Sequence, residues 1–156
     1  MSFEDAAALQ YGREIENVWN NQDPDAVYDI HHSNSQVTGM FDPIPYMDNV
    51  TINREEYKKL AELIHNATED IEVESYEVNW EGTEDGGKGR TQADWEMVFH
   101  LPMDIELHAA TRHTDDIKGG ETFWYRENED KLPKAIKTDL RWEIEEDLTD
   151  LFYHLM

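Results

Sequence analysis

The sequence contains no cysteine, few basic residues and no long apolar run, and each absence excludes a class of protein. Without cysteine the chain forms no disulfide, no cysteine-ligated zinc site and no thiolate nucleophile. It has no run of about 18 apolar residues, the length that predicts a transmembrane helix. The N-terminal segment is acidic and lacks the basic start and apolar stretch of a signal peptide, so we expect a cytoplasmic protein.

The shortage of basic residues gives the chain a strong negative charge. There are 13 lysines and arginines against 36 aspartates and glutamates, for a formal net charge of −23. Binding to nucleic acid or to an anionic membrane needs basic side chains, so both partners are excluded. Two explanations of the acidity stay open, adaptation to high salt and an ordinary acidic surface, because salt screens the self-repulsion of such a chain.

Aromatic residues are plentiful, with 5 Trp, 7 Tyr and 5 Phe among 156 residues. Aromatic side chains bury large areas, so a packed core is possible despite the charge. The length, with no internal repeat and no linker, predicts one domain over residues 1–156.

Helical periodicity dominates the first part of the chain. It predicts helices over residues 2–21, 24–31 and 54–66 and a short strand over 35–41. Ser2 or Asp5 is the expected N-cap of the first helix. Asn53 precedes the third helix and Glu56 follows three residues later, the spacing of a capping box.

From residue 70 the apolar period changes to two. Strands are predicted over residues 71–80, 93–101, 105–113, 121–126 and 135–142, followed by a short terminal helix over 145–155. In the second strand one face should hold Ala93, Trp95, Met97, Phe99 and Leu101. This order predicts an α+β fold, a curved antiparallel sheet forming a cone that the N-terminal helices close. The apolar interior of such a cone is a natural ligand site.

Three short segments resemble one known superfamily. They are residues 18–27 (VWNNQDPDAV), residues 41–45 with 53–57 (FDPIP, NREEY), and residues 123–125 with 137–142 (FWY, KTDLRW). They are similar to the nuclear transport factor 2-like (NTF2-like, SnoaL-like) superfamily, with its cystatin-like cone, which includes ketosteroid isomerase, polyketide cyclases, scytalone dehydratase and bile-acid dehydratases. The resemblance implies a cofactor-independent lyase or isomerase acting on a small apolar hydroxy-carbonyl or polyketide-like ligand.

The chain also departs from that pattern. Trp19 and Asn20 stand where scytalone dehydratase has a Tyr-Asp pair, Val73 where it has a histidine, and Gly39 near the place of a tyrosine. In this alignment the dehydration machinery of that enzyme is missing. A non-catalytic ligand-binding or dimerisation module of the same fold is therefore the alternative function.

Four residues are the catalytic candidates. The resemblance places Asp94 and Arg141 at positions shared with bile-acid dehydratases, and Glu121 near an acidic hydrogen-bond donor of ketosteroid isomerase. An apolar cone would raise the pKa of Glu121 and suit it to acid–base work, unless it lies on the rim. Asp94 and Arg141 form either a substrate-binding pair or a structural salt bridge, in which Asp139 is the other possible partner. His113 is suited to proton transfer, unless it belongs to a solvated loop.

The expected partners are a small apolar ligand and further copies of the chain. Aromatic side chains predicted to contact the ligand are Tyr11, Trp19, Tyr46, Phe99 and Phe123. Trp124 should lie on the opposite, exposed face from Phe123, which indicates a homodimer or homotrimer formed through the sheet.

Histidine spacing predicts no metal site. His31 and His32 are adjacent and cannot share one helical face. His108 and His113 are five residues apart, on opposite faces of a regular strand. No metal-binding or phosphate-binding motif is present, so neither a metal nor a nucleotide cofactor is expected.

Overall fold

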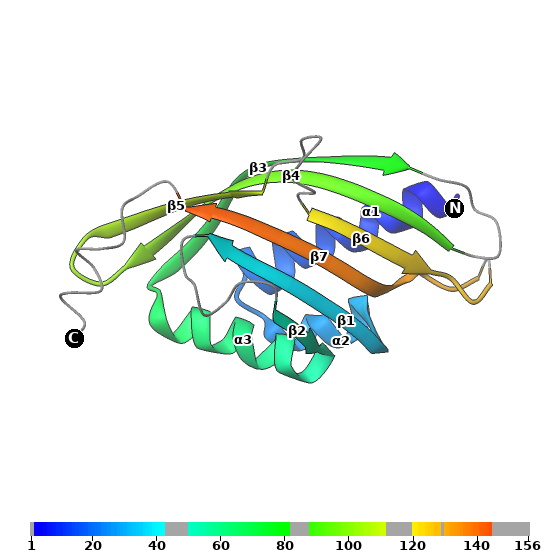
Figure 1. Ribbon diagram of the computed structural model, residues 1–156, viewed down its shortest axis with the longest axis horizontal. Helices are drawn as coiled ribbons and strands as arrows, with labels where there is room; N and C mark the ends of the chain where they lie inside the picture. The colour runs from blue at the N-terminus through cyan, green and yellow to red at the C-terminus, as the bar shows by residue number, and fades with distance from the viewer. Residues whose placement is uncertain (1, 43–49, 82–87, 112–119, 129, 145–156) are drawn as a thin grey trace.

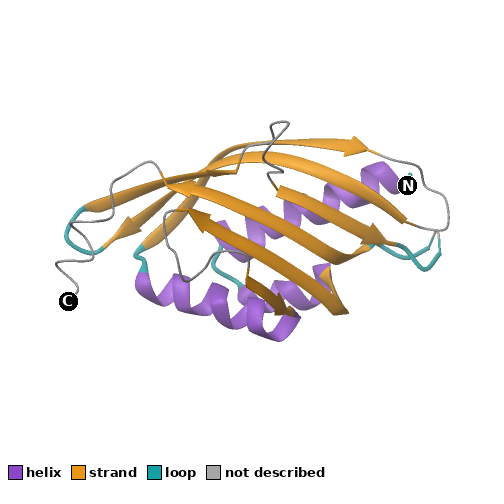
Figure 2. Cartoon of the chain, viewed as in Figure 1, coloured by secondary structure: helices purple, strands orange, loops and turns teal. Residues whose placement is uncertain are grey.

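Helices cover one face of a large curved sheet (Figures 1 and 2). The computed structural model describes residues 2–42, 50–81, 88–111, 120–128 and 130–144. The helical elements are α1 (Phe3–Arg13), η1 (Glu14–Asn20), η2 (Pro24–Ala26), α2 (Val27–Ile30) and α3 (Arg54–Ala67). The predicted α+β class is confirmed, with the helices in the first half of the chain.

The first predicted helix is present, but it changes type partway along. Ser2 is its N-cap, with its hydroxyl accepting a hydrogen bond from the Asp5 amide at 3.1 Å. After Arg13 the helix widens into the π-helical turns of η1. Stretches of π-helix are rare and often occur at functional sites.

The second and third predicted helices are also confirmed. The second begins as the 3-10 turn η2 at Pro24 and continues as α2. Asn53 caps α3 and forms the predicted capping box with Glu56. A four-residue strand, β2 (Val50–Asn53), precedes α3; it is too short to give a periodic signal and was not predicted.

The other strands are β1 (His31–Asp42), β3 (Asp70–Glu81), β4 (Lys88–Leu101), β5 (Ile105–Thr111), β6 (Gly120–Tyr125) and β7 (Lys134–Ile144). Along the sheet the order is β2-β1-β7-β5-β4-β3. β5 and β6 lie end to end between β4 and β7, since each pairs with a different part of those two long strands. The sheet is mixed and not wholly antiparallel, because β1 runs parallel to β7. The terminal helix expected over 145–155 lies outside the described residues.

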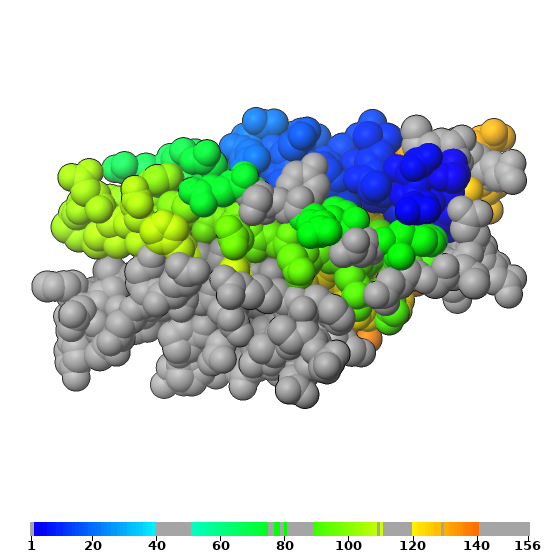
Figure 3. Space-filling model, turned by 90° about the horizontal axis from the view of Figure 1, so that it is seen from above, coloured from blue at the N-terminus to red at the C-terminus, as the bar shows by residue number. Residues whose placement is uncertain are grey.

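The core lies between the helices and the sheet. Ala93, Trp95 and Met97 of β4 are buried in it and Phe99 packs against it, as the alternation predicted. Seen from above, α1 and η1 lie alongside β3 and β4 (Figure 3). Among the described residues, no helix is long and apolar enough to cross a membrane.

Candidate functional site

Three polar side chains meet in the interior, between the helices and the sheet. Oε1 of Glu14 accepts a hydrogen bond from the Tyr57 hydroxyl at 2.8 Å and lies 2.9 Å from Nε2 of His31. All three are buried, and His31 is 0% exposed. Buried polar groups of this kind are costly unless paired, so the network is a specific feature of the fold.

Three separate elements bring these groups together. Glu14 is the first residue of η1, His31 is the first residue of β1, and Tyr57 lies in the first turn of α3. The capping box at the start of α3 includes Glu56, the residue immediately before Tyr57. The rings of His31 and Tyr57 pack with centroids 5.1 Å apart.

The network keeps Glu14 ionised. Burial opposes its charge, but electrostatic attraction to the His31 ring and the hydrogen bonds from His31 and Tyr57 outweigh burial, so the pKa of Glu14 lies below its ordinary value. Burial raises the pKa of Tyr57 well above its usual range, and the negative charge of Glu14 raises it further. Tyr57 therefore stays protonated and donates its hydrogen to the carboxylate.

An ionised carboxylate only accepts hydrogen bonds, so Nε2 of His31 must carry the hydrogen that it shares with Glu14. In the neutral imidazole this leaves the lone pair on Nδ1, as in histidines that a carboxylate orients for proton abstraction. Nδ1 is buried and has no hydrogen-bond partner among the described residues. In this tautomer Nδ1 is therefore left as a hydrogen-bond acceptor.

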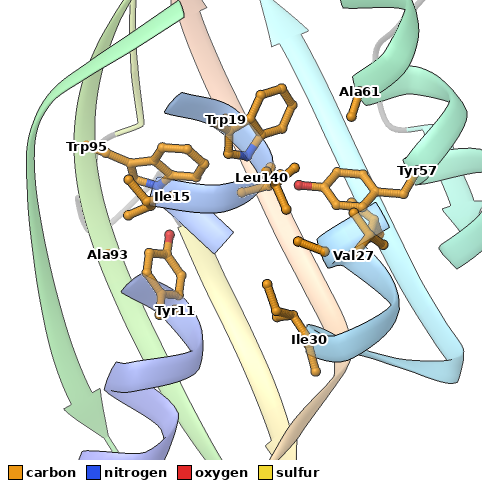
Figure 4. Packing of buried hydrophobic residues seen from close by; sticks show 14 of the residues in the cluster. Tyr11, Ile15, Trp19, Val27, Ile30, Tyr57, Ala61, Ala93, Trp95 and Leu140 are labelled. Atoms are coloured by element: carbon orange, nitrogen blue, oxygen red, sulfur yellow. The ribbon is translucent and has the colours of Figure 1, made fainter. Parts of the chain in front are cut away.

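A second tyrosine enters the interior from α1. Tyr11 is 1% exposed, and its ring meets that of Trp95 edge to face, with centroids 6.1 Å apart (Figure 4). Burial raises the pKa of Tyr11 well above its usual range, and the charge of Glu14 adds to this, so its hydroxyl remains a donor. A Cβ on Gly120 would lie 3.0 Å from that hydroxyl and 2.8 Å from the Trp95 indole nitrogen. Only glycine leaves room here.

The sheet beneath the helices presents small polar side chains. Thr122 of β6 pairs with Thr138 of β7, and both are buried. Their hydroxyls, and that of buried Ser35 on β1, have no hydrogen-bond partner within the described part of the chain. Buried hydroxyls are nearly always paired, with protein, water or ligand, so these three groups have hydrogen-bonding capacity that the described residues do not use.

Of the ligand contacts expected from sequence, three lie on the interior side. Tyr11 and Trp19 are buried there, and Phe99 packs against the same core. The ring centroid of Trp19 lies 6.3 Å from that of Tyr57 on α3 (Figure 4). It lies 5.9 Å from that of His65 on the same helix. Tyr46 lies outside the described residues.

Glu121 and Phe123 lie on the other face of the sheet. Successive side chains of a strand alternate, and Gly120 faces Tyr11 and Trp95, so Glu121 points away from the helices. It is 2% exposed, lies 3.7 Å from Nη1 of Arg90, and accepts a 3.4 Å hydrogen bond from Gln92. The structure therefore does not bring Glu121 to the side of the sheet where Tyr11 and Trp19 meet.

The expected exposure of Trp124 is wrong. It is 0% exposed, and its indole N–H donates to the Thr91 hydroxyl at 2.8 Å. Both faces of β6 carry aromatic residues, and the larger side chain, the indole of Trp124, lies on the face that packs against the core. An exposed tryptophan thus gives no support for an interface through the sheet.

The remaining catalytic candidates are dispersed or undescribed. Asp94 is half-buried on β4, opposite Glu77 of β3. Arg141 pairs through its backbone with Met40 in the β1–β7 register, and its side chain is outside the described set. His113 lies outside the described residues. Roles for Asp94, Arg141, His113 and Glu121 remain predictions.

Sequence reasoning missed Glu14, His31 and Tyr57. In the sequence each looks like an ordinary residue of a helix or strand, and His31 was considered only as a metal ligand beside His32. The one available indication was that Glu14 falls on the apolar face of the first predicted helix. Within the described ranges, no group of three or more histidine, aspartate or glutamate side chains gathers as a metal site would.

Comparisons with known proteins address the fold. No protein-family model matches the chain, and no curated protein sequence matches it. Solved structures do match: the BvnE pinacolase of Penicillium brevicompactum has a TM-score of 0.61 at 9% identity, over 98% of this chain and 95% of its own. A protein assigned as a scytalone dehydratase in Novosphingobium aromaticivorans has a TM-score of 0.66 at 11% sequence identity, over 89% of this chain and 83% of its own.

A protein assigned as a dehydratase of the NTF2-like family, from Streptomyces avermitilis, gives a TM-score of 0.61 at 12% identity, over 92% of this chain and 96% of its own. At identities this low, the structural matches show a shared fold but do not identify the reaction. The chain has the NTF2-like fold, as the resemblance implied.

Proposed function

We propose that the chain is a small-molecule enzyme of the lyase or isomerase type, in which His31 moves a proton next to a carbonyl group. The observation that carries this proposal is the buried carboxylate of Glu14, held between His31 and Tyr57. Such reactions need a base near the substrate carbon and a donor for the oxyanion that develops. The chain supplies both types of group in its interior.

In the proposed reaction Nδ1 of His31 is the general base. Glu14 is a positioning residue, which fixes the tautomer of the imidazole and stabilises the imidazolium formed when His31 takes the proton. Tyr57 positions Glu14 in turn. Tyr11 is the proposed donor to the substrate oxygen, because its hydroxyl stays protonated and enters the same interior.

The proposed substrate is a small apolar hydroxy-carbonyl compound. The aromatic surfaces of Trp19, Trp95 and Phe99 favour an apolar body, and the hydroxyls of the sheet favour a molecule that also carries oxygen atoms. Several proteins of similar fold are named as dehydratases or as a pinacolase, which supports the same broad class. Elimination of water from a β-hydroxy ketone is the simplest reaction of this kind. The Cα–H bond breaks and its proton goes to His31, the Cβ–O bond then breaks as the double bond forms, and the imidazolium returns the proton to the departing hydroxyl, which leaves as water.

The test is a screen of β-hydroxy ketones, following the absorbance of the conjugated enone. We expect His31→Asn to lower kcat/KM by about 10²- to 10⁴-fold, the usual contribution of a general base. Tyr11→Phe should lower it by about 10²-fold or more, as loss of one oxyanion donor does. His32→Asn is the matched control, since His32 is adjacent and its Nδ1 only accepts a hydrogen bond from the Asn34 amide.

The alternative function is a non-catalytic ligand-binding module, which the complete burial of His31 favours. Equal rates for His31→Asn and the parent protein, with both folded, would rule out the proposed base. Binding of the same ketones without turnover, by chemical-shift changes at Trp19 and Trp95, would establish the module instead.

A further inference from the structure

A surface groove is formed by a different set of residues from the interior site, since Glu14, His31 and Tyr57 do not line it. It has a volume of about 570 Å³ and lies between α1, η1, α2 and the connection from β6 to β7. Arg13 and Ile30, which immediately precede Glu14 and His31, are among its lining residues. The groove and the buried network are therefore built from neighbouring residues at the α1–η1 and α2–β1 junctions.

The charge of this groove differs from that of the chain as a whole. Arg13, Lys131 and Lys134 line it, against two acidic residues, Asp29 and Asp130. The chain has nearly three times as many acidic as basic residues. Even so, none of these three basic side chains forms an ion pair with any described carboxylate. A small local excess of positive charge is thus left for a ligand.

A buried amide supports the basic rim. Gln10 is 1% exposed, and its Nε2 donates to the carbonyl oxygens of Asp29 at 3.1 Å and Pro133 at 2.9 Å. This fixes the side chain, whose Oε1 accepts a hydrogen bond from Nη1 of Arg13 at 3.3 Å. Arg13 is thereby positioned at the groove, with other N–H donors still available.

The groove also has an apolar wall. Ala26 and Ile30 line it from the helical side, and Leu132, which is 39% exposed, lines it from the β6–β7 connection. Apolar surface next to basic side chains suits a molecule that has both an anionic and an apolar part. Asp29 and Asp130 would repel further negative charge, which favours a ligand with a single charge.

We propose that this groove binds a monocarboxylate with a short apolar chain. Arg13, Lys131 and Lys134 would hold the carboxylate, and Leu132 would contact the apolar chain beside Ile30, which is itself 1% exposed. The proposal does not depend on catalysis in the interior, because it concerns a different set of side chains.

The test is an NMR titration of the full chain, labelled at backbone amides and at isoleucine and leucine methyls, with hexanoate at constant ionic strength. We expect saturable shifts at Ile30 and Leu132. Acetate, which lacks the chain, and hexanol, which lacks the charge, should each bind at least about tenfold more weakly. Hexylammonium should cause no saturable shift, and the dicarboxylate adipate should bind more weakly than hexanoate.

Two variants separate the groove from general charge effects. Lys134→Gln should raise the Kd for hexanoate by about tenfold, the loss expected for one charge-assisted contact. Lys59→Gln removes the same charge from an exposed position on α3 and should leave the Kd unchanged.

Several results would overturn the proposal. Equal affinity for hexanol and hexanoate would show a purely apolar site, and equal loss in both lysine variants would show nonspecific ion binding. Shifts confined to Trp19 and Trp95 would place hexanoate in the interior. Because the readout is binding, an inactive interior would not affect this outcome.

Discussion

The hydroxyl of Tyr57 donates a 2.8 Å hydrogen bond to the carboxylate of Glu14, a residue 43 positions earlier in the chain. The same oxygen atom lies 2.9 Å from Nε2 of His31. One carboxylate therefore joins the first helix, the start of β1 and α3. A change at any of these groups should affect both local chemistry and stability.

Replacing Glu14 should alter the dependence of stability on pH. The pKa of Glu14 in the folded protein lies below its ordinary 4.5, so the ionised form stabilises the fold above that value, and this contribution is lost as the pH falls through the folded pKa. We expect Glu14→Gln to lower the free energy of unfolding at neutral pH by about 1–3 kcal/mol. Below pH 4.5 its stability should fall less steeply than that of the parent protein.

Denaturant unfolding at a series of pH values measures this effect. Glu16→Gln is the control, because Glu16 is an exposed carboxylate of the same η1 segment. Parallel stability curves for Glu14→Gln and the parent protein would contradict the inferred pKa shift.

Tyr11 and Tyr57 should not ionise with the exposed tyrosines. Their pKa values are raised well above 10.0, chiefly by burial. We expect Tyr57→Phe to leave the tyrosinate absorbance step near pH 10 unchanged. Since a raised folded pKa means that stability is lost as the pH rises through it, the buried tyrosines should ionise only on alkaline unfolding. A smaller step near pH 10 in Tyr57→Phe would contradict this.

Adding a methyl group at residue 120 should destabilise the protein. In Gly120→Ala the new Cβ would lie 3.2 Å from the Ala93 carbonyl oxygen, in addition to its contacts with Tyr11 and Trp95. We expect a loss of about 1–3 kcal/mol, as for other overpacked sites. Gly12→Ala, within α1, should instead stabilise the helix by about 0.5–1 kcal/mol. Thermal unfolding of the two variants provides the comparison, and equal stability of Gly120→Ala and the parent protein would be inconsistent with the tight packing.

The melting temperature should rise when KCl is added, because ions screen the repulsion within a chain of net charge −23. Screening alone should be nearly complete by about 1 M salt, where the Debye length is about 3 Å. A continued steep rise beyond that concentration would favour adaptation to high salt over an ordinary acidic surface. A melting temperature that does not change with KCl concentration would exclude both strong charge repulsion within the chain and adaptation to high salt.

Local sequence signals placed most secondary structure correctly. The caps of α1 and α3 depend on residues three apart, and the face of β4 that carries Ala93, Trp95 and Met97 depends on strict alternation. These patterns involve neighbours in the chain, so the sequence is enough to recognise them. The parallel pairing of β1 with β7 joins segments about 100 residues apart and had no local signal.

The face of β6 could not be assigned in the same way. Its residues, GETFWY, offer an aromatic side chain to either face, and the sequence interpretation chose Phe123 for the interior. The structure buries Trp124 there, opposite Gly89 of β4, and its N–H donates to the hydroxyl of Thr91 on the same strand. That choice turns Glu121 to the other face, toward Arg90 and Gln92.

The sequence by itself determined the acidic charge, the helix caps, the strand periods and the α+β class, since each is set by composition or by residues close together in the chain. The tertiary structure alone decided which polar groups share the interior. Glu14, His31 and Tyr57 meet because η1, the start of β1 and α3 pack against one another, and no local pattern encodes their distance from one another.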